Sequence, residues 1–232
     1  MKKIIWVIDQ VLRKIRLDWI KAILPKKGYL YATGWIKSTI SKKPIDRNRN
    51  PIPWLTYGFL EFLEPRLKKE MNVFEFGSGN STLWFASRVN SVTSVEHNES
   101  WFNYIKSSFP KNVKLDLREY PDKDIDFHIR AFLPFSSESE YSRYILETDI
   151  NYDIIVVDGI DRNNSIKYAV QKAGKNGVIV VDNLEYEKEF SEGVQFLYSE
   201  GYKLLPYWGL SPGVHHKTCT GVFYRSENCL KI

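Results

Sequence analysis

The sequence predicts a doubly wound α/β fold, in which a mostly parallel sheet carries helices on both faces. Short apolar runs alternate with stretches of helical periodicity between residues 72 and 199. Two of the runs, 154–157 and 178–181, are apolar at every position, as is typical of parallel strands buried on both faces. A third run, 72–76, breaks into a glycine turn that opens a helix.

The first 70 residues are expected to form a basic extension to a domain that spans residues 71–232. Thr56 is the expected cap of the last helix of this extension. Four segments are expected in the extension, in chain order: a basic amphipathic helix, an irregular aromatic segment, a stiff proline-containing stretch and a helix, at 3–24, 26–50, 51–54 and 56–69.

The domain itself is expected to alternate strand and helix, with an irregular interruption at 120–150. Its last two strands, 203–208 and 220–225, are expected to form an antiparallel hairpin. The remaining strands are predicted at 72–76, 92–96, 113–118, 152–157 and 178–181, and the helices between them at 81–88, 99–108, 163–174 and 187–199.

Charge is distributed unevenly along the chain. The first 70 residues hold 16 Lys and Arg against 6 acids, whereas the remainder holds 17 against 22. A nucleic-acid enzyme would carry its positive charge around the active cleft, so nucleic acid is an unlikely substrate. Cys219 and Cys229, the two cysteines, are expected to be reduced, which fits a cytoplasmic location.

Residues 3–24 are not expected to be a signal peptide, because the apolar run 4–8 is too short and no small-residue cleavage site follows. They are not expected to span a membrane, because charges interrupt the segment throughout. Two interpretations remain open. The helix lies peripherally on the anionic inner face of the membrane. Alternatively, it packs on the domain or on a partner chain, which would make a homodimer one arrangement to consider.

The turn after the run at 72–76 is the most informative motif. Glycine at 77 and 79 lets the backbone turn tightly and approach a ligand closely, and Ser81 or Thr82 can cap the next helix. An acidic residue opens the turn, and Glu96 ends the following apolar run. This layout suits a ligand with a cationic amino acid end and a ribose. A simple tight connection is the alternative, and a dinucleotide fingerprint would require glycine where Thr82 stands.

These motifs resemble those of class I S-adenosylmethionine-dependent methyltransferases. Residues 75–82 resemble the first motif of that superfamily, and 94–97 the end of its second strand. The chain is also similar, from about residue 30 onward, to an uncharacterised bacterial subgroup that carries lead-ins like 34–38 and 51–57. The resemblance implies a Rossmann-like methyltransferase sheet and S-adenosylmethionine as cofactor.

The resemblance also implies which residues bind the cofactor. Glu96 would take both ribose hydroxyls, because a carboxylate can accept two hydrogen bonds, and His97 and Asn98 would border the adenine. The full set of expected cofactor residues is Glu75, Gly77, Ser78, Gly79, Asn80, Ser81, Thr82, Glu96, His97 and Asp158.

A metal site is implied by a second resemblance. The sequences ending at Asp158 and at Asp182-Asn183 are similar to strand ends of catechol O-methyltransferase-like enzymes, in which two aspartates and an asparagine hold Mg²⁺ beside the methyl group. Oxygen ligands suit that ion. As alternatives, the acids cap helices and Asp182-Asn183 forms a turn. The chain has no clear match to the basic lysine of such enzymes.

Candidate catalytic residues are Asp158 and two histidines, His215 and His216, in the loop 211–217. Either imidazole would serve as general base near neutral pH, although exposed loop histidines often have no role. Arg162 is expected to bind a carboxylate or phosphate of the substrate. Alternatively, it only balances charge near the start of its helix.

The function predicted from these features is O-methylation of a small-molecule or glycan hydroxyl, with Trp35 and Trp54 as stacking surface. Two alternatives stay open. One is a non-catalytic methyltransferase-like module, used for binding or scaffolding and docked through its basic helix. The other is a nicotinamide-dependent oxidoreductase, which the missing third glycine disfavours.

Overall fold

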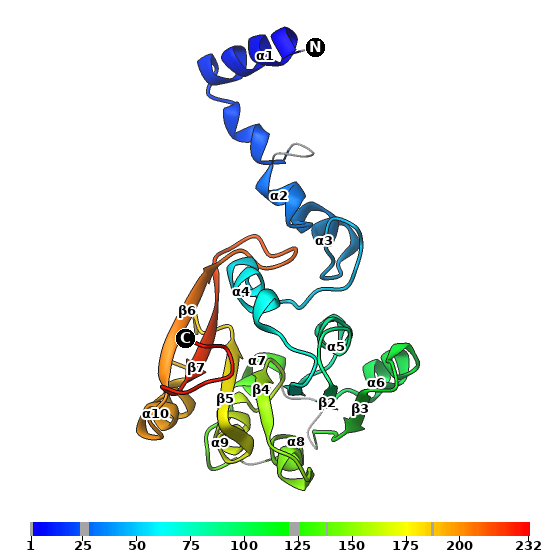
Figure 1. The fold of residues 1–232 in the computed structure, drawn as a ribbon, viewed down its shortest axis with the longest axis vertical. Coiled ribbons are helices and arrows are strands. Elements are labelled where there is room, and N and C mark those ends of the chain that lie inside the picture. The colour runs from blue at the N-terminus through cyan, green and yellow to red at the C-terminus, as the bar shows by residue number, and fades with distance from the viewer. Residues whose placement is uncertain (1, 24–27, 121–125, 138, 187) are drawn as a thin grey trace.

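The computed structural model describes residues 2–23, 28–120, 126–137, 139–186 and 188–232. A seven-stranded sheet forms its centre (Figure 1). From one edge to the other, the strands are β3 (Val113–Leu117), β2 (Ser91–Glu96), β1 (Asn72–Phe76), β4 (Tyr152–Val157), β5 (Ala173–Asp182), β7 (Thr218–Tyr224) and β6 (Lys203–Gly209).

The strand order reverses between β1 and β4, and this places a topological switch point at the centre of the sheet. Strands β1 to β5 pair in parallel, for example with Phe74 opposite Ile155, while β7 runs antiparallel to both β5 and β6. The predicted doubly wound sheet with an antiparallel C-terminal hairpin is therefore confirmed. The carboxyl ends of β1, β2, β4 and β5 meet at one edge, which is where ligands bind in such sheets.

Each face of the sheet carries its own hydrophobic core, because alternate strand residues point to opposite faces. In β4, Ile154 and Val156 pack with α4 and α5, whereas Ile155 and Val157 pack with α8, α9 and α10. The bounds of these helices are α4 (Tyr57–Leu63), α5 (Asn80–Ala86), α8 (Glu140–Arg143), α9 (Arg162–Lys172) and α10 (Ser191–Ser199). The division of the chain at residue 70 stays a prediction. Residues 52–63 contribute to the core on the face of the sheet that carries α4 and α5.

The helix expected over 3–24 is divided in the structure. It consists of α1 (Lys2–Lys14) and the 3₁₀ helix η1 (Asp18–Ile23). The break lies at Arg16, whose φ is +58°, and Leu17 N donates to Leu12 O at 2.8 Å in the pattern that closes a Schellman cap. Figure 1 shows α1 at the end of an arm that leads away from the sheet. None of the helices that the structure describes combines the length and the apolar character needed to cross a bilayer.

The prediction that 26–50 is irregular is wrong for part of that segment. It contains α2 (Tyr29–Ala32) and α3 (Trp35–Ser41). Long-range contacts stabilise them: Trp35 Nε1 of α3 donates to Val214 O at 2.7 Å, and the Tyr29 ring of α2 packs edge-on against Tyr57 at 6.3 Å. These partners are distant in sequence, so local periodicity could not reveal them. Residues 24–27 lie outside the described part.

Other boundaries also differ from expectation. The strand expected at 178–181 is longer, since β5 begins at Ala173, inside the helix expected at 163–174. The helix expected at 56–69 is α4 followed by the 3₁₀ helix η2 (Glu64–Arg66), since Pro65 lacks the N–H that an α-helix needs. The interruption at 120–150 includes α7 (Phe127–Ala131), α8 and η4 (Tyr144–Glu147), although 121–125 and 138 lie outside the described residues. The helix expected from 187 begins at Ser191, as α10. Helix α6 (Glu99–Ile105) and η3 (Lys106–Ser108) together match the helix expected at 99–108.

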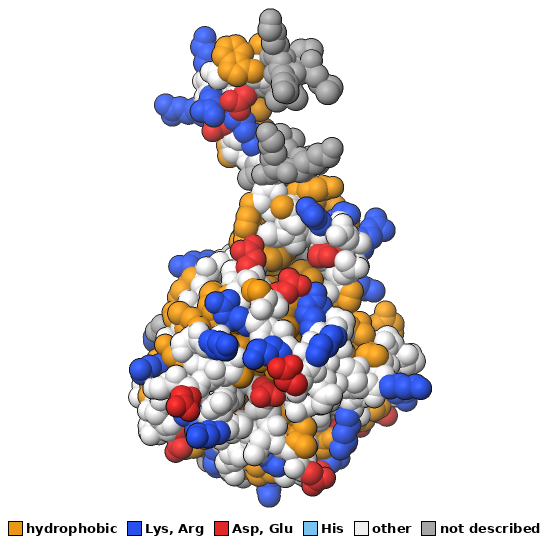
Figure 2. All heavy atoms as spheres, in the orientation of Figure 1, with side chains coloured by type: hydrophobic (Ala, Val, Ile, Leu, Met, Phe, Trp, Pro, Cys, Tyr) orange, Lys and Arg blue, Asp and Glu red, His pale blue; other side chains and the backbone are white. Residues whose placement is uncertain are grey.

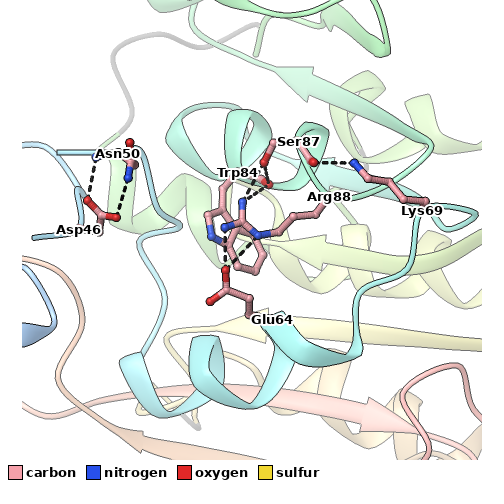
Figure 3. Close-up of polar contacts among 7 residues, drawn as sticks. All are labelled: Asp46, Asn50, Glu64, Lys69, Trp84, Ser87 and Arg88. Carbon is pink, nitrogen blue, oxygen red and sulfur yellow. Dashed lines mark hydrogen bonds and ion pairs between the residues drawn. The ribbon is translucent and has the colours of Figure 1, made fainter. Parts of the chain in front are cut away.

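A polar clamp fastens the end of α5 to the segment that precedes β1 (Figure 3). The Arg88 guanidinium donates to Glu64 Oε1 at 2.7 and 3.2 Å and to Trp84 O at 2.9 Å, and it lies 4.3 Å from the Trp84 ring. Lys69 Nζ donates to Ser87 O at 2.7 Å. The glycine turn begins α5, so the clamp restrains the far end of the helix that carries the motif.

Candidate functional site

A cavity of about 790 Å³ opens at the carboxyl ends of β1, β2 and β4. Nine of the ten residues expected to bind the cofactor line it; Thr82 is the exception. The predicted set is therefore brought together at the switch point: Glu75, Gly77, Ser78, Gly79, Asn80, Ser81, Glu96, His97 and Asp158.

Glu75, near the end of β1, is the most unusual polar group in the cavity wall. Its side chain is buried, and Oε2 accepts no hydrogen bond within the described part of the chain. Burial raises the pKa of this carboxyl to about 7, an effect that the Thr82 and Ser81 hydroxyls offset only in part. A buried carboxylate oxygen without a hydrogen-bond donor is costly, so Oε2 favours a cationic donor as its neighbour.

The glycine turn allows close approach of the backbone of β4. Gly77 has φ +99°, and a Cβ placed there would lie 3.3 Å from Asp158 O. Its N–H donates to Val95 O at 2.9 Å, and its carbonyl accepts from Ser94 Oγ at 2.8 Å. The turn is thus fixed from β2 and crowded from β4, which only glycine tolerates.

The polar residues after the turn have mainly structural contacts in this state. Thr82 is buried, and its Oγ1 accepts from Gly79 N at 3.1 Å from the third position of α5. The N-cap itself is Gly79, so the prediction that Ser81 or Thr82 occupies the cap is wrong. Asn80 Nδ2 donates to Pro44 O at 2.7 Å and joins the N-terminal segment to the motif. Ser81 lines the cavity.

Glu96, at the end of β2, is held by the turn and by its own chain. Oε1 accepts from the N–H groups of His97 and Asn98, both at 2.9 Å, and Oε2 accepts from Ser78 Oγ at 2.8 Å. Burial alone would raise its pKa, but His97 and these donors more than offset that effect and keep the pKa below its ordinary value. Glu96 therefore faces the cavity as a charged, preoriented acceptor.

Several lining residues were missed by the sequence reasoning. Trp101 lies in the helix after Glu96; its Nε1 donates to Ser78 O at 2.8 Å, and its ring stacks on Tyr104 at 5.4 Å. Its position in the first turn of the helix that follows Glu96 could have indicated from the sequence that it lines the cavity. Nothing local marked Lys42, Lys43 and Pro44, which reach the cavity by folding of the N-terminal segment.

A second cavity of about 470 Å³ adjoins the first, and the two share Trp54 and Asp158 in their walls. Its lining includes Arg162, at the start of α9, and Asp182 and Asn183, at the end of β5. The remaining lining residues are aromatic, come from the β6–β7 loop and the start of β7, or are Ala131 and the acidic Glu185; the former are Phe132, Tyr186, Ser211, Val214, His216 and Thr218.

The expected metal ligands are already engaged by a guanidinium. Arg162 is buried; Nη2 lies 3.3 Å from Asp158 Oδ1, and Nη1 donates at 2.9 Å to both Asp182 O and Asn183 Oδ1. Asp182 Oδ1 accepts from Thr220 Oγ1 at 2.5 Å. No cluster of three or more acidic, histidine or cysteine side chains with metal-binding geometry occurs in the described ranges. The three residues lie together as predicted, but with the cation supplied by Arg162 their arrangement does not fit Mg²⁺.

Two aspartates near this guanidinium have altered acidity. Burial raises the pKa of Asp158, against the opposing pull of Arg162. Burial also raises the pKa of Asp182, and the neighbouring charge of Asp158 raises it further. Asp158 separates the two cavities, so a carboxyl that exchanges protons more readily near neutral pH lies between them.

The two candidate histidines occupy different environments. His216 is exposed and lines the second cavity. His215 packs edge-on against Trp35 at 5.0 Å and is not among the described residues that line either cavity. Trp35 thereby holds the loop that presents His216.

Comparison with known proteins identifies the fold. No family model matches the chain, and no curated protein matches it. Among solved structures, a precorrin-6y C5,15-methyltransferase from Geobacter metallireducens is similar, with 15% identity and a TM-score of 0.51 over 72% of this chain and 87% of that one. Also similar is a precorrin 8w decarboxylase from Methanobacterium thermoautotrophicum, with 18% identity and a TM-score of 0.50 over 72% of this chain and 87% of that one. A methyltransferase-like protein from Silicibacter pomeroyi has 16% identity and a TM-score of 0.50 over 76% of this chain and 90% of that one. The chain has the Rossmann-like fold of these proteins.

Proposed function

We propose that this protein is an S-adenosylmethionine-dependent methyltransferase that acts on a hydroxyl of a small-molecule or glycan acceptor. The observation that carries the proposal is the pair of carboxylates in the larger cavity. Glu75 is buried without a hydrogen bond to Oε2, and Glu96 is charged and oriented at the end of the neighbouring strand. Their positions suit the ammonium and the ribose of one nucleoside ligand.

S-adenosylmethionine supplies a methyl group on a cationic sulfur, and the chain supplies complementary charge and shape. Glu75 offers a buried carboxyl at one end of the cavity, and a cationic ligand beside it would favour the ionised form of that carboxyl. Glu96 offers carboxylate oxygens to ribose hydroxyls. The stacked rings of Trp101 and Tyr104 offer an apolar wall of suitable size for adenine.

The second cavity is proposed to hold the acceptor. Its shared wall with the cofactor cavity brings an acceptor oxygen close to the transferred methyl group, and holding two reactants together removes much of the entropic barrier. Trp54, Phe132 and Tyr186 present aromatic surface, and polar groups surround it. A volume of about 470 Å³ suits a small molecule or one sugar unit of a glycan.

In the transfer, the acceptor oxygen forms a bond to the methyl carbon as the carbon–sulfur bond breaks, and the hydroxyl proton must leave. Asp158, between the cavities, and His216, on the rim, are the groups proposed to receive it. Arg162 holds Asp158 and Asn183 in place. We infer that this reaction proceeds without Mg²⁺, because the guanidinium occupies the position between the expected ligands.

The experiment is a transfer assay with ³H-methyl S-adenosylmethionine and a panel of phenols, polyols and oligosaccharides, together with an amine panel. The expected result is label in a hydroxyl acceptor, loss of turnover in Asp158→Asn, and unchanged activity with EDTA. Label only in amines would overturn the hydroxyl assignment. Cofactor binding without transfer to any acceptor would instead favour the non-catalytic module.

A further inference from the structure

The N-terminal arm, residues 2–23, presents an apolar stripe that the rest of the described chain leaves uncovered. Val7, Ile8, Val11 and Ile15 are each more than half exposed, and Val11 lies four residues after Val7, three after Ile8 and four before Ile15. Such spacing places them on a single side of α1. Exposing this much apolar surface is unfavourable in water, so the stripe requires an occupant.

Basic side chains border the stripe. The first 27 residues of the sequence hold eight Lys and Arg against two Asp. Asp9 is paired with Arg13 at 3.0 Å and with Lys21 of η1, which fixes the two helices together and cancels the only acid of α1. Lys14 and Arg16 remain exposed. Lys14, three residues after Val11, therefore places a cation at the edge of the stripe.

The arm also carries two exposed tryptophans, Trp6 and Trp19, at 64% and 62% exposure. Indole rings are enriched where an apolar phase meets water. Figure 2 shows hydrophobic and basic side chains together on the arm, beyond the rounded body of the protein. A flat surface can therefore reach α1 without first meeting the sheet and its helices (Figure 1).

We propose that the arm docks this protein on an anionic phospholipid surface, with the stripe of α1 in the headgroup region. The apolar side chains would enter the interface, and the basic side chains would meet lipid phosphates and carboxylates. A second copy of this chain is a poorer occupant, because it would bring two arms of strong positive charge together. Lipid binding is independent of methyl transfer, so it stands or fails separately from the proposed function.

The test is vesicle co-sedimentation of the full chain with phosphatidylcholine alone and with 30% phosphatidylserine added. Binding to the mixed vesicles and its loss in Val11→Asp/Ile15→Asp are expected. Ile40→Asp is the matched control, because Ile40 is 77% exposed but lies on α3; it should bind like the parent. Lys14→Gln/Arg16→Gln should weaken binding roughly fivefold for each charge removed.

The outcomes that would overturn the proposal are specific. Binding lost equally in Ile40→Asp would show a nonspecific effect, and no sedimentation with anionic vesicles would exclude the lipid surface. A lipid-free dimer in sedimentation velocity that Val11→Asp/Ile15→Asp dissociates would assign the stripe to a second copy. Thermal unfolding of each variant checks folding, and the stripe is exposed, so both apolar-to-Asp variants should unfold like the parent.

Discussion

Replacing Glu75 by glutamine should stabilise the ligand-free protein above neutral pH while weakening cofactor binding. The carboxyl is buried and its pKa is raised from 4.5 to about 7 in the folded chain. A difference of one pKa unit corresponds to about 1.4 kcal/mol, so ionising this group in the folded state costs on the order of 3 kcal/mol. Glutamine keeps the shape and cannot ionise.

The sign follows from the raised pKa. The folded chain holds the Glu75 proton more tightly than the unfolded chain, so this group favours folding below about pH 4.5, and that advantage is lost as the pH rises to about 7. Urea unfolding of the parent and of Glu75→Gln should therefore be compared from pH 4.5 to 8.5. The free energy of unfolding of the variant should rise relative to that of the parent by up to ~3 kcal/mol across this range.

Affinity for S-adenosylmethionine should fall in the same variant, although its stability above neutral pH rises. Calorimetry should show S-adenosylmethionine bound roughly ten- to a hundred-fold more weakly by Glu75→Gln, because a charge-assisted hydrogen bond is lost. Exposed Glu70→Gln is the control and should change neither property. A stability difference between parent and Glu75→Gln that does not vary with pH would refute the reasoning.

Three further predictions concern the turn, the guanidinium and the loop. Gly77→Ala should lose more stability than Gly201→Ala, because both positions have positive φ but only Gly77 is crowded by Asp158 O. Urea unfolding should show a difference of about 1 kcal/mol or more between the two variants. Equal losses of stability would contradict the crowding at Gly77. Arg162→Gln should cost about 3 kcal/mol, because it removes the counter-charge of Asp158 and the donor to Asp182 O and Asn183 Oδ1. Rescue of its melting temperature by Mg²⁺ would show that the site accepts a metal after all. Trp35→Phe should lower kcat/KM for the acceptor and leave affinity for S-adenosylhomocysteine unchanged, since the variant loses only the hydrogen bond to Val214 O. A parallel loss of affinity for S-adenosylhomocysteine would contradict a role of this bond in acceptor binding alone.

Most of the sheet followed from sequence because its strands are apolar throughout and its glycine turn is local. Burial on both faces gives runs such as Ile154–Val157 their character without reference to the rest of the chain. Placing strand ends at one edge then brought Glu75, Glu96 and Asp158 to the same cavity.

What sequence could not show depended on contacts between distant segments. Helix α3 depends on a hydrogen bond from Trp35 to Val214, which lies 179 positions further along the chain. The role of Arg162 was equally hidden, because four residues after Asp158 it resembles an ordinary first-turn residue of a helix. Only the folded arrangement places its guanidinium between Asp158 and Asn183, where the metal had been expected.

The central claim is that the cavity beside Glu75 and Glu96 holds a sulfonium nucleoside, and crystals grown with S-adenosylmethionine test it most directly. Density with the amino group at Glu75 Oε2 and the ribose hydroxyls at Glu96 is the predicted result. An empty cavity at millimolar ligand, or ligand bound elsewhere on the sheet, would contradict it.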